Sequence, residues 1–254
     1  MKRMMIAICI SIIAALAQGQ DAPKRMRPDA NRKPSGGMVE KAYGGNVFRF
    51  LDAQKSVSHD TITNIVRKMR WTTLLPVEAA SGPTQGNLTA LAQAAKRLVR
   101  EAKVGAGAII IDDPKLSFKI YTDEGNWAIL NLAFLKEDNP NLQVLVERTE
   151  KMLWRAMARA LQVGNTSNMP SVLQPFGTLA ELDANKTMVP SPDSSNWLLD
   201  NAAHYGITTL TMSSYRDACH KGWAPPPQNA IQRAIWNELR AAATNAPSAT
   251  PPAK

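Results

Sequence analysis

Residues that carry metal or nucleophilic chemistry are scarce in this sequence of 254 residues, which has three histidines and two cysteines. The spacing of His59, His204 and His220 fits no zinc-binding pattern, because zinc sites need several imidazole or thiolate ligands at characteristic intervals. Neither a glycine-rich phosphate loop nor a complete catalytic motif occurs. The sequence therefore predicts no metal and no cofactor, and it favours a binding or scaffold protein over an enzyme.

Long apolar runs are also missing, apart from one at the N-terminus. There, two cations precede an apolar run over residues 4–16, and Ala15, Ala17 and Gly19 give the small-x-small pattern of a signal peptidase site. We therefore predict a signal peptide over residues 1–19 and a secreted or periplasmic protein. The run is too short for a membrane anchor, so the processed chain has no predicted transmembrane segment.

Cysteine is almost absent from the predicted mature chain, since Cys9 lies in the signal peptide and only Cys219 remains. A single thiol forms no internal disulfide, so stability must come from an ordinary core. Cys219 is followed by His220, but neighbours on a helix point about 100° apart, which aims the imidazole poorly at the thiol. Two interpretations stay open: an extracytoplasmic hydrolase or transferase with Cys219 as nucleophile, or a thiol packed with Tyr215 and Trp223.

Acidic residues are outnumbered by basic ones, and the formal net charge is +9 at pH 7. Part of this charge lies in residues 20–45, which are rich in lysine, arginine, proline and glycine. Such a composition cannot bury a core and predicts a basic disordered arm. The arm fits either adhesion to an anionic polymer or acidic protein surface, or a solvated leader that keeps the chain soluble.

Strand and helix patterns alternate between residues 46 and 164. Stretches rich in β-branched and aromatic residues predict strands, and apolar residues three and four apart predict helices capped by Ser58 and Asn87. Gly105 and Gly107 are expected to break the second helix. The predicted fold class is α/β, with a mixed five-stranded sheet packed on helices. The predicted strands cover residues 46–52, 71–77, 108–113, 117–121 and 127–135, and the helices cover residues 59–70, about 88–100 and 141–163.

The composition changes after Gly164, which is the predicted stop of the third helix. Residues 165–196 are rich in proline, serine, threonine and asparagine without a sustained period, and three short helices are expected after them. We assign residues 165–243 to the same domain as its irregular, mainly helical C-terminal part. Residues 244–254 are expected to be a frayed tail.

The longest predicted helix has two distinct faces. One is apolar and is expected to pack on the sheet, while the other is polar and cationic. Such a stripe is ordinarily a solvated face. The apolar face comprises Leu142, Leu145, Val146, Leu153, Ala156, Met157, Ala160 and Leu161, and the cationic stripe comprises Arg148, Lys151, Arg155, Arg159 and Gln162.

The order of these elements resembles that of the metzincin-like zinc peptidases, the archaemetzincin type in particular. In that family the long helix carries a zinc-binding HExxHxxG pattern, which falls on residues 155–162 of this chain. Arg155 and Arg159 stand at the two expected histidines, and Ala156 stands at the expected glutamate. A hydrolytic zinc site needs neutral imidazoles or thiolates and a carboxylate base, and two arginines supply neither.

This resemblance covers residues 46–190 and implies a pseudoenzyme, a peptidase-like fold without the zinc chemistry. What it leaves is a cleft lined by two arginines one turn apart, which suits the binding of a carboxylate or phosphate. Alternatively, the arginines pair with Glu181, with Asp183 or with glutamates of their own helix, and hold the C-terminal part in place.

Overall fold

The computed structural model describes residues 45–53, 57–84, 86–123, 125–164, 169–211 and 214–245. The predicted signal peptide, all but the last residue of the predicted basic arm and most of the predicted tail lie outside these residues. Those three assignments stay predictions.

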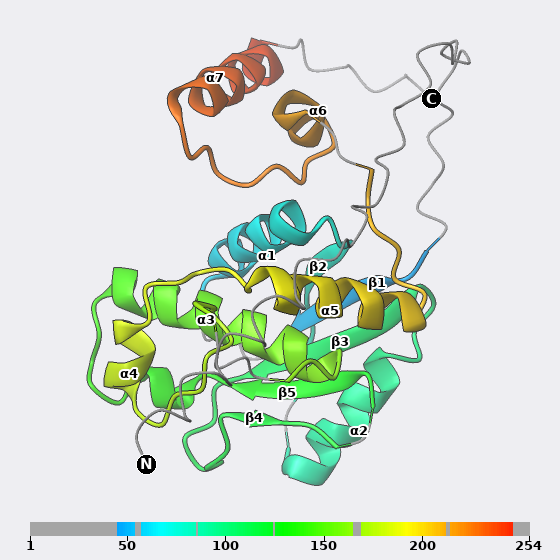
Figure 1. Cartoon of the computed structure of the whole chain (residues 1–254), viewed down its shortest axis with the longest axis vertical. Helices are drawn as coiled ribbons and strands as arrows, with labels where there is room; N and C mark the ends of the chain where they lie inside the picture. The colour runs from blue at the N-terminus through cyan, green and yellow to red at the C-terminus, as the bar shows by residue number, and fades with distance from the viewer. Residues whose placement is uncertain are drawn as a thin grey trace, which may run out of the picture. The chain divides into compact units, whose positions relative to one another are not determined.

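Five strands of the described chain form one mixed sheet: β1 (Val47–Asp52), β2 (Val77–Ser81), β3 (Val104–Ile111), β4 (Ile120–Tyr121) and β5 (Trp127–Asn131). Their order is β2-β1-β3-β5-β4, as Figure 1 shows. Strands β1, β2, β3 and β5 are parallel, whereas β4 is an antiparallel strand at the edge beside β5. The predicted α/β fold with a five-stranded mixed sheet is confirmed.

The helices of the described residues lie between and after these strands. None of them is both long and apolar enough to span a bilayer. The α-helices are α1 (His59–Thr73), α2 (Leu88–Leu98), α3 (Leu142–Ala160), α4 (Leu179–Ala184), α5 (Pro192–His204), α6 (Tyr215–His220) and α7 (Ala230–Asn245), and a 3₁₀-helix covers Ala133–Lys136.

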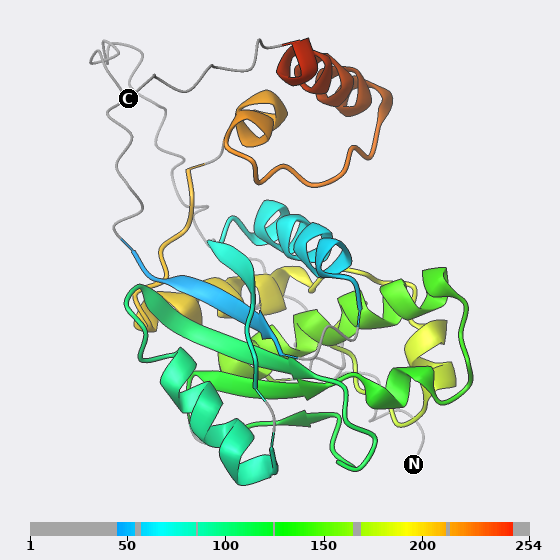
Figure 2. The same ribbon diagram turned by 180° about the vertical axis from the view of Figure 1, so that it is seen from behind.

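Helices cover both faces of the sheet (Figure 1, Figure 2). Phe48, Phe50 and Ile110 pack in the cluster that contains residues of α1 and α3, while Ile109 and Ile129 pack with α2 on the other face. The connection from β1 to β2 runs in one direction across the sheet, and the connection from β2 to β3 runs back past β1. Right-handed crossovers in opposite directions place their helices on opposite faces. The sheet therefore has an apolar core on each of its faces, and β3 is buried along its whole length.

The strand predicted over residues 71–77 is largely wrong, because its first three residues finish α1 and only its last belongs to β2. The ring centroid of Trp71 lies 5.8 Å from that of Tyr215 and 5.7 Å from that of Trp223. These contacts come from the far C-terminal part of the chain. Tertiary packing here outweighs the strand preference of an aromatic residue.

Gly105 and Gly107 do not break a helix but lie inside β3. A Cβ atom on Gly105 would lie 2.4 Å from the carbonyl oxygen of Tyr205, and one on Gly107 would lie 2.8 Å from the carbonyl oxygen of Arg49. The two glycines therefore allow neighbouring backbone to approach the central strand closely.

Candidate functional site

Helix α3 is covered on one side by the sheet and on the other by the segment over residues 169–184. The cationic stripe expected to face solvent is mostly buried, since Arg148 and Lys151 are 2% exposed and Arg155 is 6% exposed. The expectation of a solvated face is wrong for these three residues because the later segment packs over them. Arg159, one turn beyond, remains exposed.

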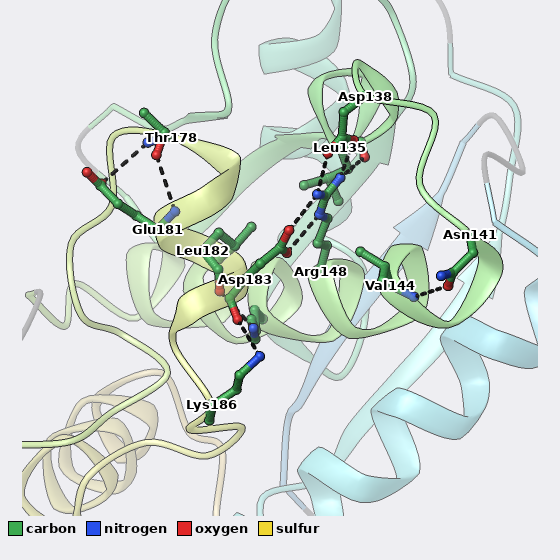
Figure 3. Close-up of polar contacts among 11 residues, drawn as sticks. Leu135, Asp138, Asn141, Val144, Arg148, Thr178, Glu181, Leu182, Asp183 and Lys186 are labelled. Atoms are coloured by element: carbon green, nitrogen blue, oxygen red, sulfur yellow. Dashed lines mark hydrogen bonds and ion pairs between the residues drawn. The ribbon is translucent and has the colours of Figure 1, made fainter.

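Arg148 is fully compensated by two carboxylates. Its guanidinium binds both oxygens of Asp138, at 2.6 and 2.7 Å, and both oxygens of Asp183, at 2.9 and 2.6 Å (Figure 3). A further N–H donates to the carbonyl of Leu135 at 2.9 Å. All five donors of the guanidinium are thus used. One buried side chain ties α4 and the turn that contains Asp138 to α3.

The electrostatics of this cluster favour its charged form. Hydrogen bonds from Arg148 lower the pKa of Asp138 and of Asp183, and the same bonds raise the pKa of Arg148 above its usual value. Lys151 lies beside the cluster and donates to the carbonyl of Leu182 at 2.7 Å. Burial lowers the pKa of Lys151, and the charge of Asp183 opposes that shift.

Helix α4 carries Asp183, but it was not among the helices expected from the sequence. A capping box starts it: the Thr178 hydroxyl accepts from the Glu181 amide at 3.2 Å, and the Glu181 carboxylate accepts from the Thr178 amide (Figure 3). The same carboxylate also accepts from the Gly177 amide at 2.6 Å. The Thr-x-x-Glu spacing of this box is readable in the sequence. Asp183 therefore pairs with Arg148, and the Glu181 carboxylate binds backbone amides. Neither carboxylate pairs with Arg155 or Arg159.

A cavity of about 430 Å³ lies beside α3 and the edge strand β4. Lys119, Arg155 and Arg159 line it, and no carboxylate of the described residues does. A neighbouring cavity of about 550 Å³ shares Thr122 and Arg159 with the first. The structure thus brings the two predicted arginines to one cavity and adds Lys119. No signal in the sequence pointed to this lysine, because a strand pattern does not show which distant helix lies beside the strand.

Arg155 is a buried cation without a carboxylate partner in the described part of the chain. Its guanidinium donates to the carbonyl of Gln174 and lies 4.6 Å from the ring centroid of Phe176. Its Nε is buried and lacks a hydrogen-bond partner among the described residues. Burial, and then the charge of Arg159, lower the pKa of Arg155 to about 10. The guanidinium therefore stays protonated at neutral pH.

Lys119 and Arg155 hold the same short segment. Lys119 donates to the carbonyl of Gly177 at 2.9 Å, and its ammonium lies 4.5 Å from the ring centroid of Phe176. The Phe176 ring also stacks on Phe134, at 6.5 Å between centroids. Cation–π contacts of this kind direct both cations toward one aromatic ring. Lys119 and Arg155 thus form one positively charged wall of the cavity, and these contacts restrict the rotamers of both side chains.

The residues at this position do not fit zinc. Guanidinium groups have no lone pair to donate to a metal, and they occupy both positions where the HExxHxxG pattern has histidine. Among the described residues, no group of three or more histidine, cysteine, aspartate or glutamate side chains is placed to hold a metal ion. No catalytic step through zinc is therefore derived for this cavity.

Helix α3 ends in a left-handed turn at Gln162, where φ is 58°. The Val163 amide donates to the Ala158 carbonyl at 2.7 Å and the Gln162 amide donates to the Arg159 carbonyl at 3.1 Å, which is the Schellman arrangement. The helix thus ends before Gly164, its predicted stop. In the HExxHxxG pattern the glycine falls on Gln162, the position whose backbone favours glycine.

Comparison with solved structures shows a similar fold in archaemetzincin. The chain is similar to archaemetzincin from Methanopyrus kandleri, with 16% identity and a TM-score of 0.51 over 63% of this chain and 98% of that chain. A zinc-dependent peptidase from Methanocorpusculum labreanum (strain Z) shows 13% identity and a TM-score of 0.44, over 59% and 99% of the two chains. No protein-family model matches the sequence, and no curated protein matches it significantly. The predicted resemblance to archaemetzincin-type peptidases is confirmed at the level of the fold.

Cys219 lies on α6, partly buried against a cluster that contains Tyr215 and Trp223. Burial raises the pKa of this thiol, while a hydrogen bond with Tyr215 and the charge of Arg216 act in the opposite direction. Nucleophilic cysteines have a lowered pKa, usually through a nearby imidazolium or another cation. The surroundings of Cys219 are those of a packing residue.

Replacing Asp183 with asparagine (D183N) should lower the free energy of unfolding by about 1 kcal/mol at pH 7, a modest cost because Asp183 is 37% exposed. Since the folded state lowers the pKa of Asp183 from 3.8, its contribution is present above that value and is lost as pH falls through the folded-state pKa. Urea denaturation should show a smaller difference between wild type and D183N at pH 2.5 than at pH 7. Equal differences would contradict this account.

Replacing Gln162 with glycine (Q162G) should raise the free energy of unfolding by about 0.5–1 kcal/mol. Glycine removes the strain of a left-handed non-glycine residue, and its larger unfolded-state entropy offsets part of the gain. Gln93, exposed within α2, provides the control, because Q93G should destabilise by about 1 kcal/mol. Thermal denaturation of both variants measures the difference, and destabilisation of equal size in both is the contrary result.

Proposed function

We propose that this chain is an exported, non-catalytic binding protein built on a peptidase-like fold, whose cavity beside α3 holds an anionic group. Arg155, Arg159 and Lys119 supply the positive charge. The fold gives the position of the cavity, but the function follows from the chemistry of the residues that line it. The apolar run and small residues within 1–19 support export.

The buried guanidinium of Arg155 is the observation that carries this proposal. A buried charge is costly unless an opposite charge and hydrogen bonds compensate it. Arg148, on the same helix, has two carboxylates, whereas no carboxylate of the described residues pairs with Arg155. An anion bound in the cavity would supply the missing charge. Arg159 and Lys119 border the same space and would share that anion.

The absence of zinc-binding chemistry from the same helix supports a binding role over hydrolysis. Arg155 and Arg159 stand where the peptidase pattern has its ligands, and Ala156 stands where it has its base. The raised pKa of Cys219 gives no support to a thiol nucleophile. Binding is therefore the activity for which the described residues have suitable side chains.

The proposal is tested with inorganic phosphate and with acetate, titrated at constant low ionic strength and followed by chemical-shift changes or calorimetry. We expect saturable binding by wild type and affinity at least about fivefold weaker for R159Q, which removes one charge-assisted hydrogen bond. Arg97, exposed on α2 at the opposite face of the sheet, gives the matched control R97Q, which should bind like wild type. Binding that R159Q leaves unchanged, or no binding of either anion, overturns the proposal.

A double substitution at the two arginines tests the missing zinc chemistry. R155H/R159H places two imidazoles one helical turn apart, as a helical zinc motif requires. We expect wild type to bind no stoichiometric zinc at pH 7, and R155H/R159H to bind zinc at least about tenfold more tightly than R155A/R159A. Equilibrium dialysis followed by metal analysis measures all three proteins. Stoichiometric zinc in the wild type would refute a non-catalytic role.

A further inference from the structure

The cavity beside α3 has an apolar part as well as a cationic one. Most of its lining residues other than Lys119, Arg155 and Arg159 are apolar or aromatic, and Thr122 is the polar exception. Its volume of about 430 Å³ falls in the range typical of small-molecule sites and far exceeds that of one inorganic anion. The apolar and aromatic lining consists of Ile120, Tyr121, Met152, Pro175 and Phe176.

The residues of α3 that line the cavity become more exposed to solvent from Met152 to Arg159 along one face of the helix. Met152 is 1% exposed, Arg155 is 6% exposed and Arg159 is exposed to solvent. Residues three and four apart lie on one face of a helix, so the three side chains follow each other along the cavity. Met152 therefore lies about one turn before Arg155 on the helix, at the more deeply buried end of the cavity lining. Ile120 and Phe176 both pack against the apolar cluster that contains Met152.

We propose that the ligand is an organic acid with an apolar body, a statement that rests on the anion binding proposed above. Its carboxylate lies among Arg155, Arg159 and Lys119, and its hydrocarbon part lies against Met152, Ile120 and Phe176. An inorganic anion would satisfy the cations but leave the half-buried apolar surface of Ile120, Tyr121 and Phe176 in contact with water. A carboxylic acid of several carbons covers it, and each buried methylene contributes to affinity.

A homologous series of acids tests this inference on the unmodified protein. Acetate, butanoate and hexanoate keep one head group and differ only in their hydrocarbon part, and hexylamine carries the same chain with the opposite charge. We expect affinity to rise about two- to fourfold per added methylene, and hexylamine not to bind. Constant affinity along the series overturns the inference, as does binding of hexylamine equal to that of hexanoate.

Substitutions at Met152 locate the hydrocarbon part. M152Q has nearly the size of the wild-type side chain but is polar, and M152L keeps it apolar. Hexanoate should bind about tenfold more weakly to M152Q than to M152L, while acetate should bind equally to both. Because Met152 belongs to the core, circular dichroism melting must show that both variants are folded. If M152Q does not fold, the chain-length series decides alone.

The outcomes separate this inference from the proposed function. If acetate and phosphate bind in a manner that R159Q weakens, and chain length adds nothing, the cavity binds anions but the apolar-acid inference is wrong. If no anion binds, both proposals are wrong. If affinity rises with chain length but R159Q has no effect, the apolar surface binds the acids without help from Arg159, and both proposals are again wrong.

Discussion

The buried ion pairs of Arg148 hold together the parts of the chain that form the site. With Asp138 on one side and Asp183 on the other, the guanidinium uses all of its donors and fastens α4 to the outer side of α3. Once α4 and the segment before it lie there, Arg155 is enclosed and Phe176 meets both cations of the cavity wall. Without this attachment the stripe would be the solvated face of an ordinary amphipathic helix.

Two arginines on one helix therefore have different electrostatic surroundings. Arg148 is paired with two carboxylates of its own chain and has no donor left for a ligand. Arg155 is nearly as buried but has only a carbonyl and an aromatic ring as described partners. For the proposed anion site, this means that the guanidinium is already desolvated and held in place before a ligand arrives.

The likeness to archaemetzincin shows similarity of the fold alone. In this chain the long helix α3 packs on the sheet and ends in a turn with left-handed backbone at Gln162. The HExxHxxG pattern, placed on residues 155–162, would have its histidines at Arg155 and Arg159, and neither guanidinium can bind zinc. A cleft whose shape suits one chemistry can serve another when its lining residues change.

Local patterns in the sequence predicted the α/β class, the mixed sheet, the long helix and the resemblance, because apolar periodicity, caps and element order are properties of neighbouring residues. They also singled out Arg155 and Arg159. They failed where distant packing decides: Trp71 stays helical against Tyr215 and Trp223, and the segment over residues 169–184 covers most of a stripe expected to be solvated. By itself, then, the sequence determined which residues share a helix face. Only the tertiary structure decided which of them are buried, which are neutralised and which line the cavity, because burial and charge pairing depend on segments far apart in the chain.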